Sequence, residues 1–372
     1  MPFSDLMREG ERVMVVCNAC RYCEGYCAVF PAMEKRLSFT EADLRYLANL
    51  CHNCGECLYA CPYAPPHQFG INVPRTLAQI RLSSYEAYAW PDGLSKAFRR
   101  HSVLSALGLS AAFAALMLGL VAVFSGNGLG QPVRDAEFYQ VIPHHVMVAM
   151  FGGVFGFASI VLGIGFVRFW RDARETPSTL TSALAHPWAL THALRDVFTL
   201  KYLHAAGADC TYSDAETRTP WRRWFHHCTY YGFMLCFAAT TVAAVYHFAL
   251  GWQAPYAYAS APVALGTAGG IGLVLGPAGL LWLRRRRDPA TSDPAQDGLD
   301  VSFIVLLLLT SVTGLLLLMF RETAAMTTLL VIHLSVVLAL FVTLPYGKFV
   351  HGIYRSAALL KYALESESVL RS

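Results

Sequence analysis

Eight of the eleven cysteines fall into two runs with the same spacing. The runs are Cys17-x2-Cys20-x2-Cys23-x3-Cys27 and Cys51-x2-Cys54-x2-Cys57-x3-Cys61, the second followed by Pro62. This spacing is typical of the thiolate ligands of two [4Fe–4S] clusters, in which the fourth cysteine of each run reaches across to the other cluster. Zinc sites usually use two cysteine pairs or a mixed Cys/His set, which two runs of four do not match.

The crossed arrangement predicts which thiols share a cluster. One cluster is expected on Cys17, Cys20, Cys23 and Cys61, and the other on Cys51, Cys54, Cys57 and Cys27. The first run departs from the pattern, because Ala28 rather than proline follows Cys27. Between the runs, residues 40–50 are expected to form a helix, with Thr40 as its N-cap and Asp43 as the capping-box partner.

The composition indicates a membrane protein. Hydrophobic residues make up 55% of the 372 residues and charged residues only 15%, whereas soluble chains carry about 25% charged residues. The net charge of +4 is small, and no nucleic-acid partner is expected. The first 16 residues lack the apolar core of a signal peptide, so the cysteines are expected in the cytoplasm, reduced or bound to metal.

The chain divides into a polar head and an apolar membrane domain. Residues 1–95 are expected to form a ferredoxin-like helical domain, 96–360 a six-helix membrane bundle and 361–372 a tail. Apolar segments long enough to cross a lipid bilayer lie at about 102–124, 143–167, 226–250, 261–283, 301–320 and 325–350. The predicted fold class is therefore a mainly α membrane protein whose bundle is cytochrome-b-like.

Lysine and arginine residues predict the orientation of the spans. One set of span ends carries Arg99, Arg100, Arg168, Arg171, Arg174, Arg222, Arg223, residues 284–287, Lys348 and Arg355. The opposite loops carry only Arg134 and Arg321. Both termini and a long loop at 168–225 are therefore expected on the cytoplasmic side of a bacterial inner membrane.

Histidines in or beside the spans are candidate axial ligands for haem, because ionisable residues are costly in a membrane. The candidates are His226, His227 and His247 in the third span and His333 and His351 in the sixth. Antiparallel spans would put His351 at the depth of His226 or His227, and His333 at the depth of His247. At about 100° per residue, His333 and His351 share a face, and the phase favours His226 over His227.

One or two b-type haems are expected on these histidines. The alternative is that a buried histidine is a hydrogen-bonded structural residue. No CxxCH motif is present, so covalent c-type attachment is not expected. His144 and His145, at the outer start of the second span, are expected to be interfacial anchors.

Three features in this order resemble the tricarballylate/citrate-utilisation protein B family across essentially the whole chain. They are the two cysteine runs, the segment RRWFHHCTYYGFMLCFAATTVAAVYH and the segment HLSVVLALFVTLPYGKFVHGIYR. The last segment is also similar to the haem-bearing last helix of nitrate-reductase-type cytochrome b subunits. That likeness falls on His333 and His351, which flank a Pro-aromatic-x-Lys stretch.

The family resemblance implies a relay of electrons. A separate FAD-dependent dehydrogenase that oxidises tricarballylate to cis-aconitate would donate electrons, which would pass through the clusters and haem to the membrane quinone. A related fused protein serves cobalamin ring contraction, so the same module can serve more than one flavoprotein.

The sequence predicts an electron-transfer subunit without a substrate-oxidising site of its own. It contains no GxGxxG motif after a strand, so neither flavin nor nicotinamide is expected in this chain. Three alternatives remain open: transfer from quinol to a cytoplasmic reductase or cobalamin-synthesis flavoprotein, a redox-sensing membrane protein, and spans that serve only as an anchor.

Overall fold

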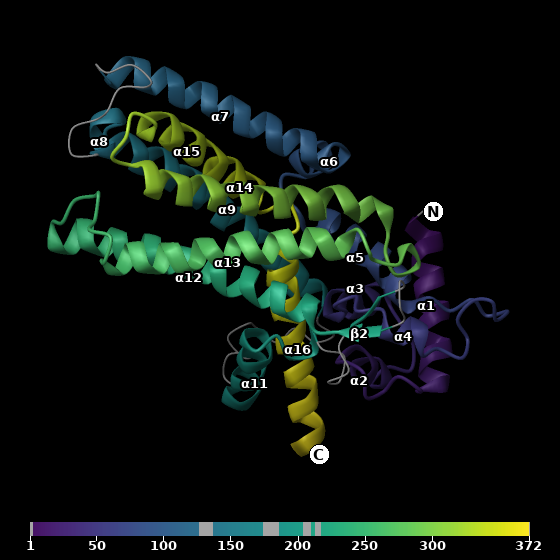
Figure 1. The fold of residues 1–372 in the computed structure, drawn as a ribbon. Helices are drawn as coiled ribbons and strands as arrows, with labels where there is room; N and C mark the ends of the chain where they lie inside the picture. Colours follow the sequence, from purple (N-terminus) through teal and green to yellow (C-terminus); the bar gives the residue numbers. More distant parts are fainter. Residues whose placement is uncertain (1–2, 126–136, 174–185, 204–209, 213–216, 372) are drawn as a thin grey trace.

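The computed structural model describes residues 3–125, 137–173, 186–203, 210–212 and 217–371. These residues are mainly helical, as the sequence predicts (Figure 1). One short antiparallel ladder pairs β1 (Cys210–Tyr212) with β2 (Thr217–Thr219). Arg134, Arg174 and part of the expected loop at 168–225 lie outside the described residues.

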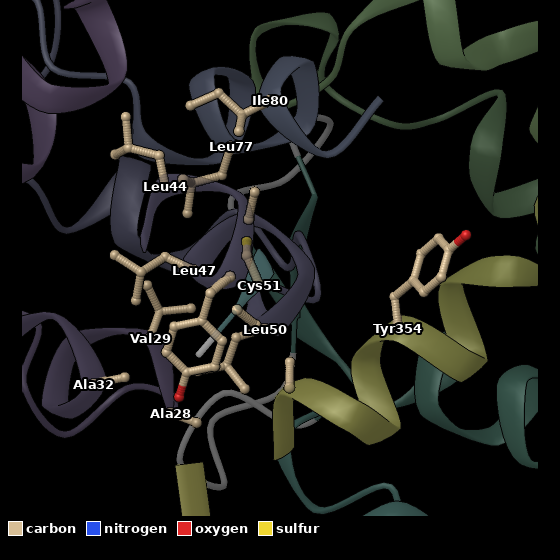
Figure 2. Close-up of a cluster of buried hydrophobic side chains, with 14 of the residues drawn as sticks. Ala28, Val29, Ala32, Leu44, Leu47, Leu50, Cys51, Leu77, Ile80 and Tyr354 are labelled. Carbon is tan, nitrogen blue, oxygen red and sulfur yellow. The ribbon is translucent and has the colours of Figure 1, made fainter. Parts of the chain in front are cut away.

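The head consists of short helices around an apolar core. They are α1 (Phe3–Cys20), α2 (Val29–Glu34), α3 (Glu41–Leu50), α4 (Glu56–Tyr59), α5 (Val73–Tyr88) and α6 (Asp92–Arg100). Leu44 and Leu47 of α3 pack with Leu77 and Ile80 of α5 (Figure 2). The predicted capping box at the start of α3 is confirmed, because the Asp43 N–H donates to Thr40 Oγ1 at 3.2 Å.

Among the described residues, six helices are long and apolar enough to cross a membrane. They are α7 (Ser102–Phe124), α9 (His144–Asp172), α12 (Trp221–Leu250), α13 (Ala261–Arg284), α14 (Asp297–Phe320) and α15 (Met326–Thr343). Helices α12 and α13 run side by side and α14 packs against α13, whereas α15 packs against α14, and α7 and α9 pack against α15 (Figure 1). The connections include α8 (Phe138–Val141), α11 (Pro187–Phe198), η3 (Pro289–Thr291) and η4 (Pro294–Gln296).

The last membrane helix is shorter than the expected span of 325–350. Helix α15 ends at Thr343, and α16 (Val350–Arg371) follows in a different direction (Figure 1). Pro345 lacks the N–H that would donate to the Phe341 carbonyl in a continuing helix, and that carbonyl instead accepts a hydrogen bond of 3.4 Å from Leu344. The expectation that one continuous helix carries both His333 and His351 is therefore wrong.

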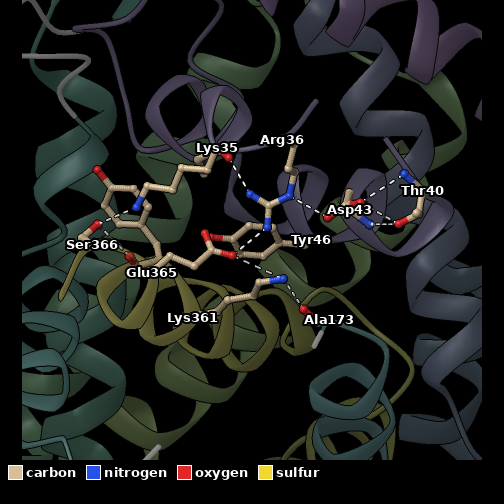
Figure 3. Close-up of polar contacts among 11 residues, drawn as sticks. Lys35, Arg36, Thr40, Asp43, Tyr46, Ala173, Lys361, Glu365 and Ser366 are labelled. Carbon is tan, nitrogen blue, oxygen red and sulfur yellow. Dashed lines mark hydrogen bonds and ion pairs between the residues drawn. The ribbon is translucent and has the colours of Figure 1, made fainter. Parts of the chain in front are cut away.

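Helix α16 includes the expected tail and docks on the head. Arg36, which is only 5% exposed, donates to Asp43 (2.6 Å) within the head and to Glu365 (2.7 Å) on α16. Tyr46 also donates to Glu365, at 3.3 Å, and Lys361 donates to the carbonyl of Ala173 (Figure 3). Breaking such a buried ion pair leaves an uncompensated charge, so this network holds the head against the membrane domain.

Glycines allow α12 and α13 to approach closely, as in many membrane helix pairs. A Cβ atom built on Gly276 would lie 2.6 Å from the backbone nitrogen of Thr229 and 2.7 Å from the carbonyl oxygen of Phe225. One on Gly269 would lie 2.8 Å from the nitrogen of Cys236. These contacts are with backbone atoms, so a side chain there would push the two helices apart.

We predict that Gly276→Ala lowers the stability of the membrane domain by about 1–3 kcal/mol, because overpacking must separate α12 from α13. Thermal unfolding of the purified chain in detergent measures the change. Gly163→Ala is the matched control, because a Cβ there has no atom within 4 Å. Equal unfolding temperatures for the two variants would contradict the predicted close packing.

Candidate functional site

The first cavity of the head collects thiols from both cysteine runs. Cys17 and Cys20 lie in the last turn of α1, and Cys23 lies in the turn that follows. Cys61, which follows α4, lines the same cavity, as does Cys57. The cavity therefore brings together all four thiols of one predicted crossed set.

The second cavity collects the other predicted set. It is lined by Cys27 from the first run and by Cys51, Cys54 and Cys57 from the second. Cys51 follows directly on α3, where the Leu47 carbonyl accepts its N–H at 3.0 Å. The two cavities thus contain the two sets of four that the crossed arrangement predicts, and the ligand roles themselves stay predictions.

The thiols are held in an environment that opposes their ionisation unless a cation is present. Burial, and then repulsion from Cys61, raises the pKa of Cys17 and of Cys23 to about 12. Burial also raises the pKa of Cys27 to about 12 and that of Cys57 well above its ordinary value. Bound iron would reverse this effect, because a metal deprotonates the thiols that ligate it.

The thiol-lined cavities fit the binding of iron–sulfur clusters. Among the described residues, no group of three or more His, Cys, Asp or Glu side chains gathers where one metal ion could be held. The thiols instead line cavities between helices, with aromatic neighbours such as Tyr22 and Tyr63 in the first.

A third and larger cavity, of about 200 Å³, lies between the head and the membrane helices. Cys51 and Cys54 form part of its wall on the head side. The apolar part of its wall comes mainly from α13 and α14, with Leu280, Leu283, Phe303, Ile304 and Leu307. His226 and His351 also face this cavity, so it adjoins both the second thiol set and a histidine pair.

The geometry of His226 and His351 fits a metal held between them. Their ring centres are 6.2 Å apart, with the planes at 64°. An imidazole nitrogen binds a transition metal at about 2 Å, so two rings on opposite sides of one ion have centres roughly 6 Å apart. His351 Nδ1 lies 2.5 Å from the carbonyl of Lys348, an arrangement that orients Nε2 for ligation. His226 Nδ1 is buried and has no hydrogen-bond partner among the described residues.

His227 is directed elsewhere, although it is adjacent to His226. Its Nδ1 lies 2.9 Å from the carbonyl of Arg223 and its Nε2 lies 3.4 Å from that of Thr199. Its ring stacks on Tyr231 with the centres 5.9 Å apart. The cavity wall includes His226 and not His227, which agrees with the phase argument.

The outer histidines contact different partners from those expected. His247 stacks on His144 of α9, with ring centres 3.9 Å apart and planes at 28°. His333 lies 3.1 Å from Thr313 Oγ1 and packs against Gly314 of α14. His144, the first residue of α9, therefore contacts α12, and its expected role as an interfacial anchor stays a prediction.

Basic side chains form much of the polar wall of the third cavity. The lining residues include Arg81, Arg222, Arg284, Arg287, Lys348 and Arg355, against the carboxylates of Asp288 and Asp300. Asp300 pairs with Lys348 at 2.8 Å and with Arg284 at 3.1 Å. Burial, and then repulsion from Arg222, lowers the pKa of Arg287 to about 10.

Sequence reasoning did not assign these arginines to the site. A signal was available, because Arg222 precedes His226 by one helical turn and Arg355 follows His351 by one turn. Residues four apart share a helix face, so both arginines belong to the faces that carry the candidate ligands.

The fold and the thiol cavities define a class: a mainly helical protein with a helical iron–sulfur head and six membrane-length helices. The family model described as the citrate utilization protein B Fer4-like domain matches residues 10–87, and the model of citrate utilization protein B matches residues 98–370. Citrate utilization protein B of Escherichia coli is 51% identical over 358 residues, which cover 96% of this chain and 92% of that protein. The chain belongs to the citrate utilization protein B family. No solved structure matches it.

We predict that Cys27→Ala removes about half of the iron, because Cys27 shares a cluster with the second run. Cys27→Ala with Cys54→Ala should lose no more iron than either change alone. Cys27→Ala with Cys20→Ala should lose nearly all of it. Iron and acid-labile sulfide per chain measure the outcome, and Cys236→Ala, outside the two runs, is the control. The reverse pattern in the double variants would show that the ligands are not crossed.

Proposed function

We propose that the chain is a membrane-bound electron-transfer protein. It passes electrons from a partner FAD-dependent dehydrogenase through two [4Fe–4S] clusters and haem b to the quinone pool. The observation that carries the proposal is the third cavity, because its wall includes Cys51 and Cys54 on one side and the facing pair His226 and His351 on another.

The chain's own residues supply the sites that such a relay needs. The eight thiols of the two runs would hold the clusters, and His226 and His351 would hold the iron of a haem in a cytochrome-b-like bundle. When bound, these groups supply the one-electron carriers between a flavin and a quinone, each of which exchanges two electrons. The apolar side chains of α13 and α14 give the cavity an apolar wall, and the basic side chains would offset negative charge there.

The number of haems that the geometry supports best is one. His226 and His351 face each other across a cavity, whereas His247 stacks on His144 and His333 lies against α14. A ring pair with centres 3.9 Å apart has no room for an ion between the rings. We therefore propose the first haem at His226 and His351 and no second haem between His247 and His333.

The orientation of the chain in the membrane and the identity of its partners rest on further arguments. The basic residues around the head side of the bundle favour a cytoplasmic head and cytoplasmic termini in the bacterial inner membrane. A cytoplasmic head can meet a soluble flavoprotein. The name of the Escherichia coli relative, citrate utilization protein B, supports a role in the use of citrate or of a similar tricarboxylate such as tricarballylate.

We predict that His226→Ala abolishes the b-type optical spectrum, whereas His227→Ala leaves it nearly unchanged. The two histidines are neighbours on α12, but only His226 faces the cavity. Reduced-minus-oxidised spectra and extracted haem content of the purified chain measure the effect. The iron–sulfur content should stay constant in both variants, which shows that the head still folds.

The same two variants test the relay. We expect a soluble quinone to reoxidise the chemically reduced wild-type chain, and His226→Ala to slow this reaction at least about tenfold relative to His227→Ala. A wild-type chain without a b-type spectrum would contradict the haem, and equal rates in the two variants would contradict the route past His226.

A further inference from the structure

Three arginines donate hydrogen bonds to four consecutive backbone carbonyls beside the second thiol set. The pairs are Arg355 to Leu50 (3.1 Å), Arg81 to Cys51 (2.6 Å), and Arg222 to both His52 and Asn53 (2.7 Å each). We call these three residues the arginine clamp. They come from three elements, α16, α5 and α12, so the contact is a product of the tertiary fold.

The four carbonyls of residues 50–53 all point toward the arginine clamp. The N–H of Asn53 points the other way, 3.4 Å from Cys51 Sγ. Asn53 has a φ of +58° and Gly55 one of +89°, both in the left-handed region. Hydrogen bonds to cluster sulfurs and nearby charge are the means by which a protein sets a cluster's reduction potential.

The first thiol set has one such contact, and it comes from an exposed side chain: Arg21 donates to the carbonyl of Asn18 at 3.0 Å. Among the described residues, neither thiol cavity is lined by lysine, arginine, aspartate or glutamate, so the two sets differ in the buried arginines that bind the backbone just outside the second cavity. By contrast, Arg81 is buried, and burial followed by repulsion from Arg81 lowers the pKa of Arg355. Buried positive charge is screened less than exposed charge. The charge of the clamp arginines therefore acts mainly on a cluster held by the second thiol set.

We propose that the arginine clamp makes the centre at Cys27, Cys51, Cys54 and Cys57 the higher-potential of the two. This inference rests on the proposed function. Each added electron makes a cluster more negative, and three nearby positive charges stabilise that state. One electron at a time then moves downhill, oxidising the centre at Cys17, Cys20, Cys23 and Cys61 and reducing the centre beside the histidine cavity. The clamp residues are positioning and charge-setting residues.

Arg81 gives the sharpest test, because it lies on α5 of the head, whereas Arg222 and Arg355 share helices α12 and α16 with the candidate haem ligands. Arg81→Gln removes the charge and keeps a hydrogen-bond donor, whereas Arg81→Lys keeps the charge. Arg12→Gln is the matched control, because Arg12 also donates to a backbone carbonyl of the head, that of Phe69, at 3.0 Å. Potentiometric titration followed by electron paramagnetic resonance gives the midpoint potential of each centre in the full-length chain.

We expect Arg81→Gln to lower the equilibrium constant for reduction of one centre roughly tenfold, which lowers its midpoint potential by about 59 mV for a one-electron couple. The midpoint potential of the other centre should not change. Arg81→Lys should retain most of the wild-type potential, and Arg12→Gln should change neither centre. The responding centre should be the higher-potential one in the wild type and the one that Cys27→Ala removes.

Several outcomes would overturn the inference. One is that Arg81→Gln changes neither midpoint potential, or changes both by the same amount. Another is that Arg81→Lys shifts the midpoint potential as far as Arg81→Gln does. The last is that, in the wild type, the centre that depends on Cys27 has the lower midpoint potential of the two. If Arg81→Gln does not fold, Arg222→Gln removes a clamp charge from α12 and carries the same expectation. A chain that assembles fewer than two clusters would contradict the proposed function instead, so the two failures are distinguishable.

Discussion

Hydrogen bonds from charged side chains to the carbonyls of residues 50–53 are the interaction on which the arrangement of the two halves depends. A backbone carbonyl that is buried without a partner costs free energy, and this segment leaves helix α3 with four such groups in succession. Arg81 satisfies one from within the head, and Arg222 and Arg355 satisfy the others from α12 and α16. The same side chains therefore complete the thiol loop and attach it to the helices that carry His226 and His351.

The buried charges of the interface constrain the fold further. Arg36 is held between Asp43 of the head and Glu365 of α16, and Lys348 and Arg284 share Asp300 beside the cavity. Removing one partner of such a pair leaves an uncompensated charge, which costs more than the pair contributes. These pairs oppose any change in the packing of α16 against the head and of α13 against α14.

Several features could be predicted because their signals are local. The spacing of the cysteines, the capping box at Thr40 and the six apolar segments each depend on residues close in the chain. Helical phase relative to His247 could be applied to His226 and His227 because all three lie on one uninterrupted helix, α12, and their roles as ligands stay predictions. The same argument failed for His333 and His351, because Pro345 and Gly347 interrupt the helix between them and phase carries no information across a turn.

The sequence by itself determined the thiol pattern, the six membrane-length segments and the likeness to a known family, because composition and spacing do not depend on how the chain folds. Only the tertiary structure decided that α16 returns to the head, that His351 faces His226, that His247 meets His144, and that three arginines converge on residues 50–53. These contacts join elements as far apart as α3 and α16, and their energies depend on burial and geometry that no local pattern records.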